Sequence, residues 1–397
     1  MGAPRQGEHA AATMVCRPRS VKAWRRGVMT EWRAGSTAAR GIARTAAGAA
    51  ARWWQMLFTI VGLPGRFTET CAALTARLIE QALGPVFSTS GDTLAQITRS
   101  LLRAAAPNIV LLSHQPGSRM RRALTEAKRY FIVARDDPRT ALAHLSSRQD
   151  IALATGVQTV ASSCAAVGRF AASDWALVLD AERGGGDAAR LAVTIARHLE
   201  LPIDERGIAQ AVRGLELAAL ETPADIEAWW DGLDAGARAV AAGALDPYRF
   251  QVDEEPAGSF SWAPELFVKG DRTAEPATGP IDITGRARCL LHGPRIMLPP
   301  GSWSAAVALD FSPAAAEHSF DLELKAGAQT DHVVIRPEPG RFEANLGLSL
   351  EDLSDEPVSL TLSNQRAAFD GSVTLLDVIL TRKPEPGVTL SGAPAHA

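Results

Sequence analysis

The chain has 397 residues and 46% hydrophobic content, which is enough for two or three globular domains with ordinary cores. No run approaches the roughly eighteen uncharged apolar residues of a membrane-spanning helix. The eight His and four Cys show no CxxC or other metal-ligand spacing. We therefore expect a cytoplasmic protein with reduced thiols, no transmembrane segment and no metal.

The net charge of −3 conceals a basic N-terminal segment. Residues 1–52 are rich in Ala and carry ten Lys and Arg against two Asp and Glu. Such composition is typical of an amphipathic surface helix, a nucleic-acid-binding tail or a transit peptide. Because the segment contains no recognised nucleic-acid module, we do not expect nucleic-acid binding. We expect a weakly ordered tail, or a true start at Met29 or Met56.

From residue 56 to about 245, apolar runs alternate with longer helical patterns. The expected strands are MLFTIVG, NIVLLS, YFIVAR and WALVLD, at residues 56–62, 108–113, 130–135 and 175–180. Apolar residues at helical spacing follow the first strand, and helices are also predicted over 93–106 and 118–128. This alternation predicts an α/β domain over 53–245, with a parallel sheet flanked by crossover helices.

The pattern changes beyond residue 245. Residues 246–280 are rich in Pro and Gly and lack a helical period, so we interpret them as a linker with at most one strand. Apolar residues then alternate with polar or small ones around Trp303 and again over 320–324, 358–363 and 372–382. Turn sequences separate these runs, which predicts an all-β sandwich over 281–385 and a flexible tail over 386–397. The same alternation places Trp303 in the core.

Ligands of parallel α/β sheets gather where strands end, so the loops after the four strands are the candidate site. After the first strand, a Gly-Pro-Gly turn leads into a helix, whose free N–H groups favour an anion. Arg66 and Thr68 are placed to add to it. The alternative is a plain strand-to-helix turn with Thr68 as the N-cap.

Two further loops carry chemically useful side chains. His114 ends the second expected strand and is suited to accept a proton from a hydroxyl, although a structural role is an alternative. Arg135 ends the third strand and Arg139 opens the helix after it. Two guanidinium groups at one strand end suit a phosphate, but Asp136 and Asp137 are alternative partners for them.

Over residues 56–215, these segments together resemble the sulfotransferases that use 3′-phosphoadenosine-5′-phosphosulfate (PAPS), a P-loop-like α/β family. Pro64 and Thr68 match the phosphosulfate loop Pro-(Lys/Arg)-Ser-Gly-Thr-Thr, whereas Gly65, Arg66, Phe67 and Glu69 depart from it. SHQP resembles Thr-His-Leu-Pro, which implies that His114 is the catalytic base. YFIVARDDPR resembles the 3′-phosphate element, which implies Arg135 and Arg139 as phosphate ligands. The family's Ser falls on Ala143, leaving Ser146 as its substitute.

The C-terminal region resembles β-sandwich modules of bacterial carbohydrate-active proteins, which carry a Gly-Pro-Tyr-x-x-Leu-Pro-x-Gly turn. Gly293, Pro294, Leu298, Pro299 and Gly301 fit this turn, and Arg295 stands at the Tyr.

Together the two resemblances imply a bacterial-type sulfotransferase that moves a sulfuryl group from PAPS to a hydroxyl of a glycan or surface-polymer precursor. The alternative is a catalytically inactive scaffold whose sandwich binds a protein or saccharide. A nucleotide kinase is disfavoured because no Gly-Lys-Ser/Thr is present.

Overall fold

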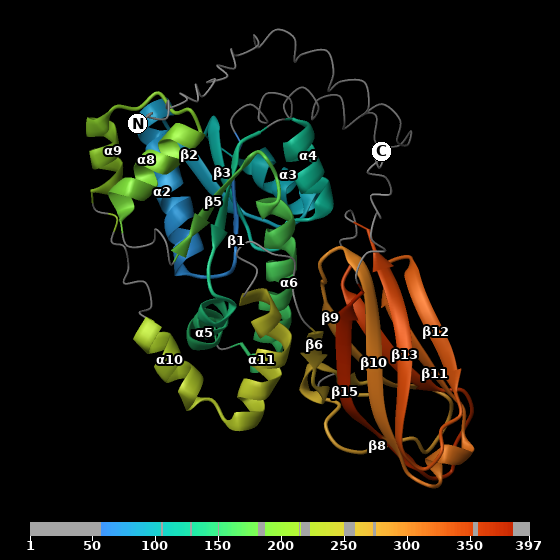
Figure 1. The fold of residues 1–397 in the computed structure, drawn as a ribbon. Helices are drawn as coiled ribbons and strands as arrows, with labels where there is room; N and C mark the ends of the chain where they lie inside the picture. Colours follow the sequence, from blue (N-terminus) through green and yellow to red (C-terminus); the bar gives the residue numbers. More distant parts are fainter. Residues whose placement is uncertain are drawn as a thin grey trace, which may run out of the picture. The chain divides into compact units, whose positions relative to one another are not determined.

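The computed structural model describes residues 57–104, 106–127, 129–149, 151–181, 187–213, 215, 223–249, 259–272, 275–351 and 356–383. All of these belong to one compact unit that spans Gln55–Ala397. The basic segment 1–52 and the tail 386–397 lie outside the described residues, as does most of the loop 180–186. Figure 1 shows the fold, an α/β layer followed along the chain by two antiparallel sheets.

Five parallel strands form the sheet of the α/β layer. They are β1 (Leu57–Gly62), β2 (Val86–Ser90), β3 (Asn108–Ser113), β4 (Phe131–Arg135) and β5 (Ala176–Asp180), in the order β2-β3-β1-β4-β5. The expected parallel sheet is confirmed, and the four expected strands correspond to β1, β3, β4 and β5. The sequence prediction missed β2, because this edge strand is half exposed and has the polar sequence VFSTS.

Helices connect and cover these strands. They are α2 (Arg66–Leu83), α3 (Leu94–Arg103), α4 (Ser118–Glu126), α5 (Pro138–Gln149), α6 (Leu153–Ala171), α8 (Ala188–His198), α9 (Glu205–Val212), α10 (Pro223–Gly232) and α11 (Ala235–Arg249). Helices cover both faces of the parallel sheet, as two neighbouring residues of β4 illustrate. Phe131 and Ile132 point to opposite faces, because successive residues of a strand do so. Ile132 lies in a core cluster with α2, α8 and α9, whereas Phe131 packs edge-on against Phe170 of α6.

Two antiparallel sheets form the C-terminal sandwich, as predicted. One has the order β13-β10-β15-β6, with β8 also paired to β15, and the other has the order β12-β11-β14-β9-β7. The strands are β6 (Ser259–Trp262), β7 (Val268–Lys269), β8 (Ile281–Asp282), β9 (Cys289–Ile296), β10 (Gly301–Phe311), β11 (Phe320–Ala326), β12 (Gln329–Ile335), β13 (Gly340–Leu350), β14 (Val358–Asn364) and β15 (Ser372–Arg382). Short 3₁₀ helices occur at η5 (Pro264–Leu266) and η6 (Ala315–Glu317).

Trp303 is a core residue of this sandwich, as the alternation of β10 predicts. Its side chain is buried, its ring lies 5.5 Å from that of Phe260, and its indole N–H donates to the carbonyl of Pro299 at 3.0 Å. Phe260 belongs to β6, which lies in the range 246–280 and pairs with β15. Trp262 and Phe267, from the same range, are also fully buried. These residues therefore belong to the core of the sandwich.

Helix α6 and the end of β9 are joined by polar contacts. The hydroxyl of Ser162 accepts a hydrogen bond from the backbone N–H of Met297 at 3.1 Å. The guanidinium of Arg169 donates to the carbonyl of Leu298 at 2.7 Å. Gln158 of the same helix donates to the carbonyl of Leu266 at 2.9 Å. Helix α6 thus contacts two backbone groups of the segment that follows β9 and one of η5.

Candidate functional site

The ends of three strands meet at the carboxyl edge of the parallel sheet. Val61 of β1 is in register with Ser113 of β3, and Gly62 is in register with Ala134 of β4. The residues that follow these positions are the loop after β1, His114 and Arg135. The register therefore brings together three segments that the sequence placed at a common site.

His114 is hydrogen-bonded to the end of the neighbouring strand. Its Nδ1 lies 2.9 Å from the carbonyl oxygen of Gly62. A carbonyl only accepts hydrogen bonds, so Nδ1 carries the proton and the neutral imidazole keeps its acceptor lone pair on Nε2. This is the tautomer that a general base at Nε2 requires.

Asp92 fixes the loop that carries His114. One carboxylate oxygen of Asp92 accepts three hydrogen bonds, from the hydroxyl of Ser113 (2.7 Å) and from the backbone N–H groups of His114 and Gln115 (2.9 Å each). Asp92 lies in the turn between β2 and α3, so this carboxylate joins two neighbouring strand ends. Sequence reasoning missed Asp92, because nothing local to the chain links it to a residue more than twenty positions away.

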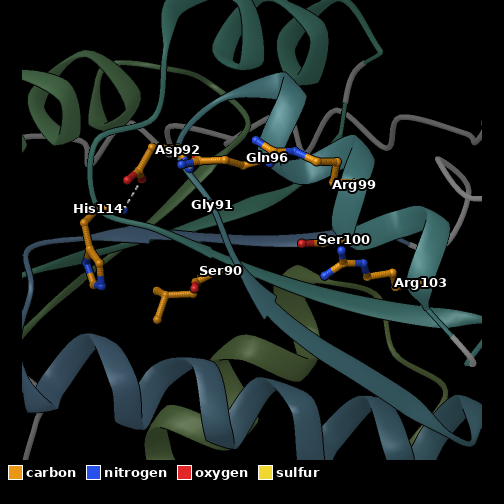
Figure 2. A pocket seen from close by; sticks show the side chains of 9 residues that line it. Ser90, Gly91, Asp92, Gln96, Arg99, Ser100, Arg103 and His114 are labelled. Atoms are coloured by element: carbon orange, nitrogen blue, oxygen red, sulfur yellow. Dashed lines mark hydrogen bonds between the residues drawn. The ribbon is translucent and has the colours of Figure 1, made fainter.

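A pocket of about 440 Å³ opens beside His114. Figure 2 shows the side chains around it, which come from the end of β2, the helix α3 and the end of β3. Arg99 and Arg103 supply positive charge from α3, and both are exposed. Within the described residues, Arg103 makes no ion pair and Arg99 donates only to the carbonyl of Ala95, at 3.3 Å. Asp92 is the single acid among the lining residues, and its carboxylate already accepts three hydrogen bonds, so the pocket favours an anionic ligand.

The two Arg residues of this pocket were not predicted, although α3 itself was. Their positions four residues apart place them on one face of the helix. The start of α3 was readable, since Thr93 and Gln96 form a reciprocal capping box. The sequence-based prediction did not include β2, and the carboxyl end of this strand forms the wall of the pocket opposite α3.

The loop after β1 is tightly packed. Residues 62–65 and Thr68 are buried. An ideal Cβ on Gly62 would lie 2.5 Å from the Thr68 hydroxyl oxygen and 2.7 Å from the carbonyl oxygen of Ala134, so only glycine fits there. The N-cap of α2 is Gly65, without a capping side chain, so the alternative that Thr68 is the N-cap is wrong. The Thr68 hydroxyl is buried and has no hydrogen-bond partner within the described part of the chain.

A carboxylate stands at the start of α2. An ideal Cβ on Gly65 would lie 3.7 Å from Oδ2 of Asp136, while Oδ1 accepts a hydrogen bond from the N–H of Asp137 at 2.8 Å. Burial, and then the charge of Asp136, raises the pKa of the Cys71 thiol to about 12. Both observations place the charge of Asp136 near the first turns of α2, where the helix dipole attracts an anion.

Arg66 and Arg135 are both near this corner. Arg66 is the first residue of α2, Arg135 is the last residue of β4, and both are half-buried. Arg135 is in register with Asp180 at the end of β5. Both residues therefore lie at the carboxyl edge of the sheet, on elements that adjoin the loop after β1.

Arg139 is engaged elsewhere. Its guanidinium makes a bidentate pair with Asp246 of α11, with both carboxylate oxygens 2.8 Å from Nη2. The same group lies 4.0 Å from the ring centroid of Trp230 of α10. These contacts join α5 to two helices and occupy the guanidinium that was expected to bind phosphate.

Ser146 lies within α5, eleven residues beyond the end of β4. Its hydroxyl is buried at the contact of α5 with α6, about 4.0 Å from an ideal Cβ on Gly156. Arg66, Thr68, His114 and Arg135 thus all lie in or next to the segments at the ends of β1, β3 and β4, whereas Ser146 packs where α5 meets α6.

The described residues contain no group of three or more His, Cys, Asp or Glu that could hold a metal ion. None of the helices seen in these residues has both the length and the apolar character to cross a bilayer.

Comparisons with known proteins give only weak structural similarities. No protein-family model matches the chain, and no curated protein matches its sequence. Among solved structures, the mouse sulfotransferase SULT7A1 complexed with PAP is 12% identical, with a TM-score of 0.33, over 44% of this chain and 69% of that one.

Two carbohydrate-binding modules are also similar. TmCBM61 in complex with β-1,4-galactotriose is 13% identical, with a TM-score of 0.21, over 32% of this chain and 90% of that one. Family 16 Carbohydrate Binding Module-2 is 11% identical, with a TM-score of 0.21, over 26% and 76%. With TM-scores this low, none of the three similarities assigns an activity to the chain.

Proposed function

We propose that this protein is a sulfotransferase that transfers a sulfuryl group from PAPS to a hydroxyl of a saccharide, with His114 as the catalytic base. The observation that carries the proposal is the hydrogen bond from His114 Nδ1 to the Gly62 carbonyl. It joins the candidate base to the end of β1, next to the loop that resembles a phosphosulfate loop. It also leaves Nε2 as the proton acceptor.

The residues at the end of β1 fit an anionic nucleotide in part. The first N–H groups of α2 lack partners within the helix, as in any helix, and favour an anion. Arg66 and Arg135 provide cations for the two phosphate positions, and Thr68 contributes a hydroxyl that has no partner in the described structure. Asp136 opposes this fit, because its carboxylate stands beside Gly65. Nucleotide binding therefore requires the Asp136 side chain to turn away.

When bound, PAPS supplies the sulfuryl group, and its bond to the 5′-phosphate oxygen breaks as the bond from sulfur to the acceptor oxygen forms. His114 Nε2 takes the proton from the attacking hydroxyl. Arg66 and the start of α2 stabilise negative charge on the leaving phosphate, and Arg135 holds the 3′-phosphate. Arg99 and Arg103 draw an anionic saccharide into the pocket beside His114.

The competing function is a catalytically inactive scaffold whose sandwich binds a saccharide or protein. Two observations favour it: residues 62–65 are buried, and a carboxylate stands where a phosphate would bind. The two functions differ in one measurable property, which is affinity for the nucleotide product 3′-phosphoadenosine-5′-phosphate (PAP).

Calorimetric titration of PAP into the full chain tests the proposal. We expect binding to the wild type and a loss of tenfold or more for Arg135→Ala, because a hydrogen bond to a charged group contributes about 1.5–3 kcal/mol. Arg206→Ala is the matched control, since it removes an exposed Arg on α9. No binding at millimolar PAP would sink the enzyme hypothesis and leave the scaffold.

His114→Ala separates binding from chemistry. We expect its PAP affinity to stay within twofold of the wild type, while transfer of labelled sulfate from PAPS to a saccharide mixture falls by about 10²–10⁴-fold. Equal activity in the wild type and this variant would remove His114 from the mechanism.

A further inference from the structure

A second cavity lies on the other side of Asp92. It measures about 500 Å³ and is bounded by the starts of α3 and α4, by Ser162 of α6 and by the end of β9 with the residues after it. Its walls are fixed by hydrogen bonds: Ser162 accepts from Met297, and the side-chain amide of Gln115 donates to the carbonyl of Thr159 at 3.1 Å. This volume suits a ligand of one or a few sugar rings.

Two cations face this cavity. Arg119 lies in the first turn of α4 and Arg295 lies on β9, and both side chains are exposed. Neither makes a hydrogen bond or ion pair with any other residue that the structure describes. Asp92 is again the single acid in the lining, and its Oδ1 already accepts three hydrogen bonds. The formal charges of these three lining residues therefore sum to about +1, because Asp92 offsets one of the two Arg residues.

The backbone of Arg295 is strained. Its φ angle is 63°, in the left-handed region that L-residues rarely adopt, yet this position holds Arg and not Gly. Strain of this kind persists where the surroundings hold it, and it is found at ligand-binding positions. In the resemblance to carbohydrate-active modules, Arg295 stands at the place of a Tyr. The structure adds that this position lies at the mouth of a cavity.

The remaining lining is mixed in character. Leu94, Met120, Met297 and Pro357 provide apolar surface, on which the C–H faces of a sugar ring pack, while Gln115 provides an amide oxygen. Because Gln115 follows His114 directly and Asp92 lines both cavities, the two cavities are neighbours. A saccharide that occupied both would present a hydroxyl to His114 and an anionic substituent to Arg119 and Arg295.

We propose that this cavity is an acceptor subsite for a uronic-acid saccharide, whose carboxylate is bound between Arg119 and Arg295. The inference rests on the proposed function, because it names the acceptor class of that same site. It assigns roles to two Arg residues on different layers, so that the sandwich contributes directly to substrate selection.

The test is binding of galacturonate and glucuronate oligosaccharides to the full chain by calorimetry, each compared with its methyl ester, in which the charge is removed. We expect the acid of at least one pair to bind tenfold or more tightly than its ester, because charge-assisted hydrogen bonds are the strong ones. Arg119→Gln and Arg295→Gln should each abolish most of this preference. Arg341→Gln, an exposed Arg on β13 outside the cavity, should preserve it.

The variant Arg295→Gly tests whether misfolding explains a loss of the preference for the acid. Glycine adopts the left-handed region without strain, so this variant should melt at a higher temperature than the wild type while losing the preference for the acid. The proposal would be overturned if acids and esters bound equally or if neither bound. It would also be overturned if Arg341→Gln lost the preference for the acid as fully as the two cavity variants. The uronate titrations contain no nucleotide, so their outcome does not depend on PAP binding. If the chain binds uronate but not PAP, the result contradicts the proposed transferase activity and not the uronate subsite.

Discussion

Removing the charge of Asp136 should strengthen nucleotide binding. The carboxylate stands beside Gly65 at the start of α2, where the proposed phosphate binds. Asp136→Asn keeps the side-chain oxygen that accepts from the N–H of Asp137, so the turn between β4 and α5 is preserved. The substitution therefore removes one negative charge and keeps this hydrogen bond.

The structure sets the size of the effect. Two unit charges about 4 Å apart repel by about 4 kcal/mol at an effective dielectric constant of about 20. An ideal Cβ on Gly65 lies 3.7 Å from Oδ2, so a phosphate oxygen bound there would lie at a comparable distance. Because the Asp136 side chain can rotate away from the phosphate, we expect less than half of this repulsion to remain, about 1.5 kcal/mol. That corresponds to an affinity gain of about tenfold.

The assay is calorimetric titration of PAP into the wild type, Asp136→Asn and Asp174→Asn. Asp174 is exposed and precedes β5 at the opposite edge of the sheet, so its variant changes net charge equally without touching the site. The tenfold gain should appear only in Asp136→Asn and should shrink at high salt. An unchanged or weaker PAP affinity in Asp136→Asn would refute the idea that this carboxylate competes with phosphate.

Three other predictions concern stability. Gly62→Ala should lower the free energy of unfolding by about 1–3 kcal/mol in urea titrations, because the new Cβ would overlap a backbone carbonyl. Gly232→Ala, with no atom within 4 Å of its Cβ, should be neutral or slightly stabilising. Arg139→Gln should cost about 1–3 kcal/mol through loss of its bidentate pair while leaving PAP affinity unchanged. Burial lowers the pKa of His198 below its ordinary 6.5, so the unfolded chain takes up a proton first and the free energy of unfolding should fall as pH drops below 6.5. His198→Gln should flatten that fall.

Each of these predictions has a contrary outcome. Equal stability of the two glycine variants would mean that the strand end relaxes around the new methyl group. A weaker PAP affinity in Arg139→Gln at unchanged stability would return Arg139 to the nucleotide site. If the free energy of unfolding falls equally with pH in the wild type and in His198→Gln, groups other than His198 take up the proton.

Local patterns in the sequence determined most of the α/β layer and the strands β10, β11, β14 and β15 of the sandwich. The strands β1, β3 and β4 are continuous apolar runs because they are buried on both faces, and β10 alternates because one of its faces is buried. His114 and Arg135 were predicted as candidates for the same reason, since each lies at the end of a strand that is easy to recognise. Buried positions recur along the chain with the period of a strand or a helix. They can therefore be predicted from the order of apolar residues without knowledge of any distant contact.

Tertiary structure decided which charges meet. Arg139 pairs with Asp246, 107 positions away, because α5 packs on α11, and this contact removes it from the phosphate ligands. Asp92 holds the His114 loop because the unpredicted strand β2 lies beside β3. Asp136 stands at Gly65, and Arg295 shares a cavity with Arg119, because elements far apart in sequence are packed together. Side-chain charge has no period along the chain, so its partners follow only from the packing.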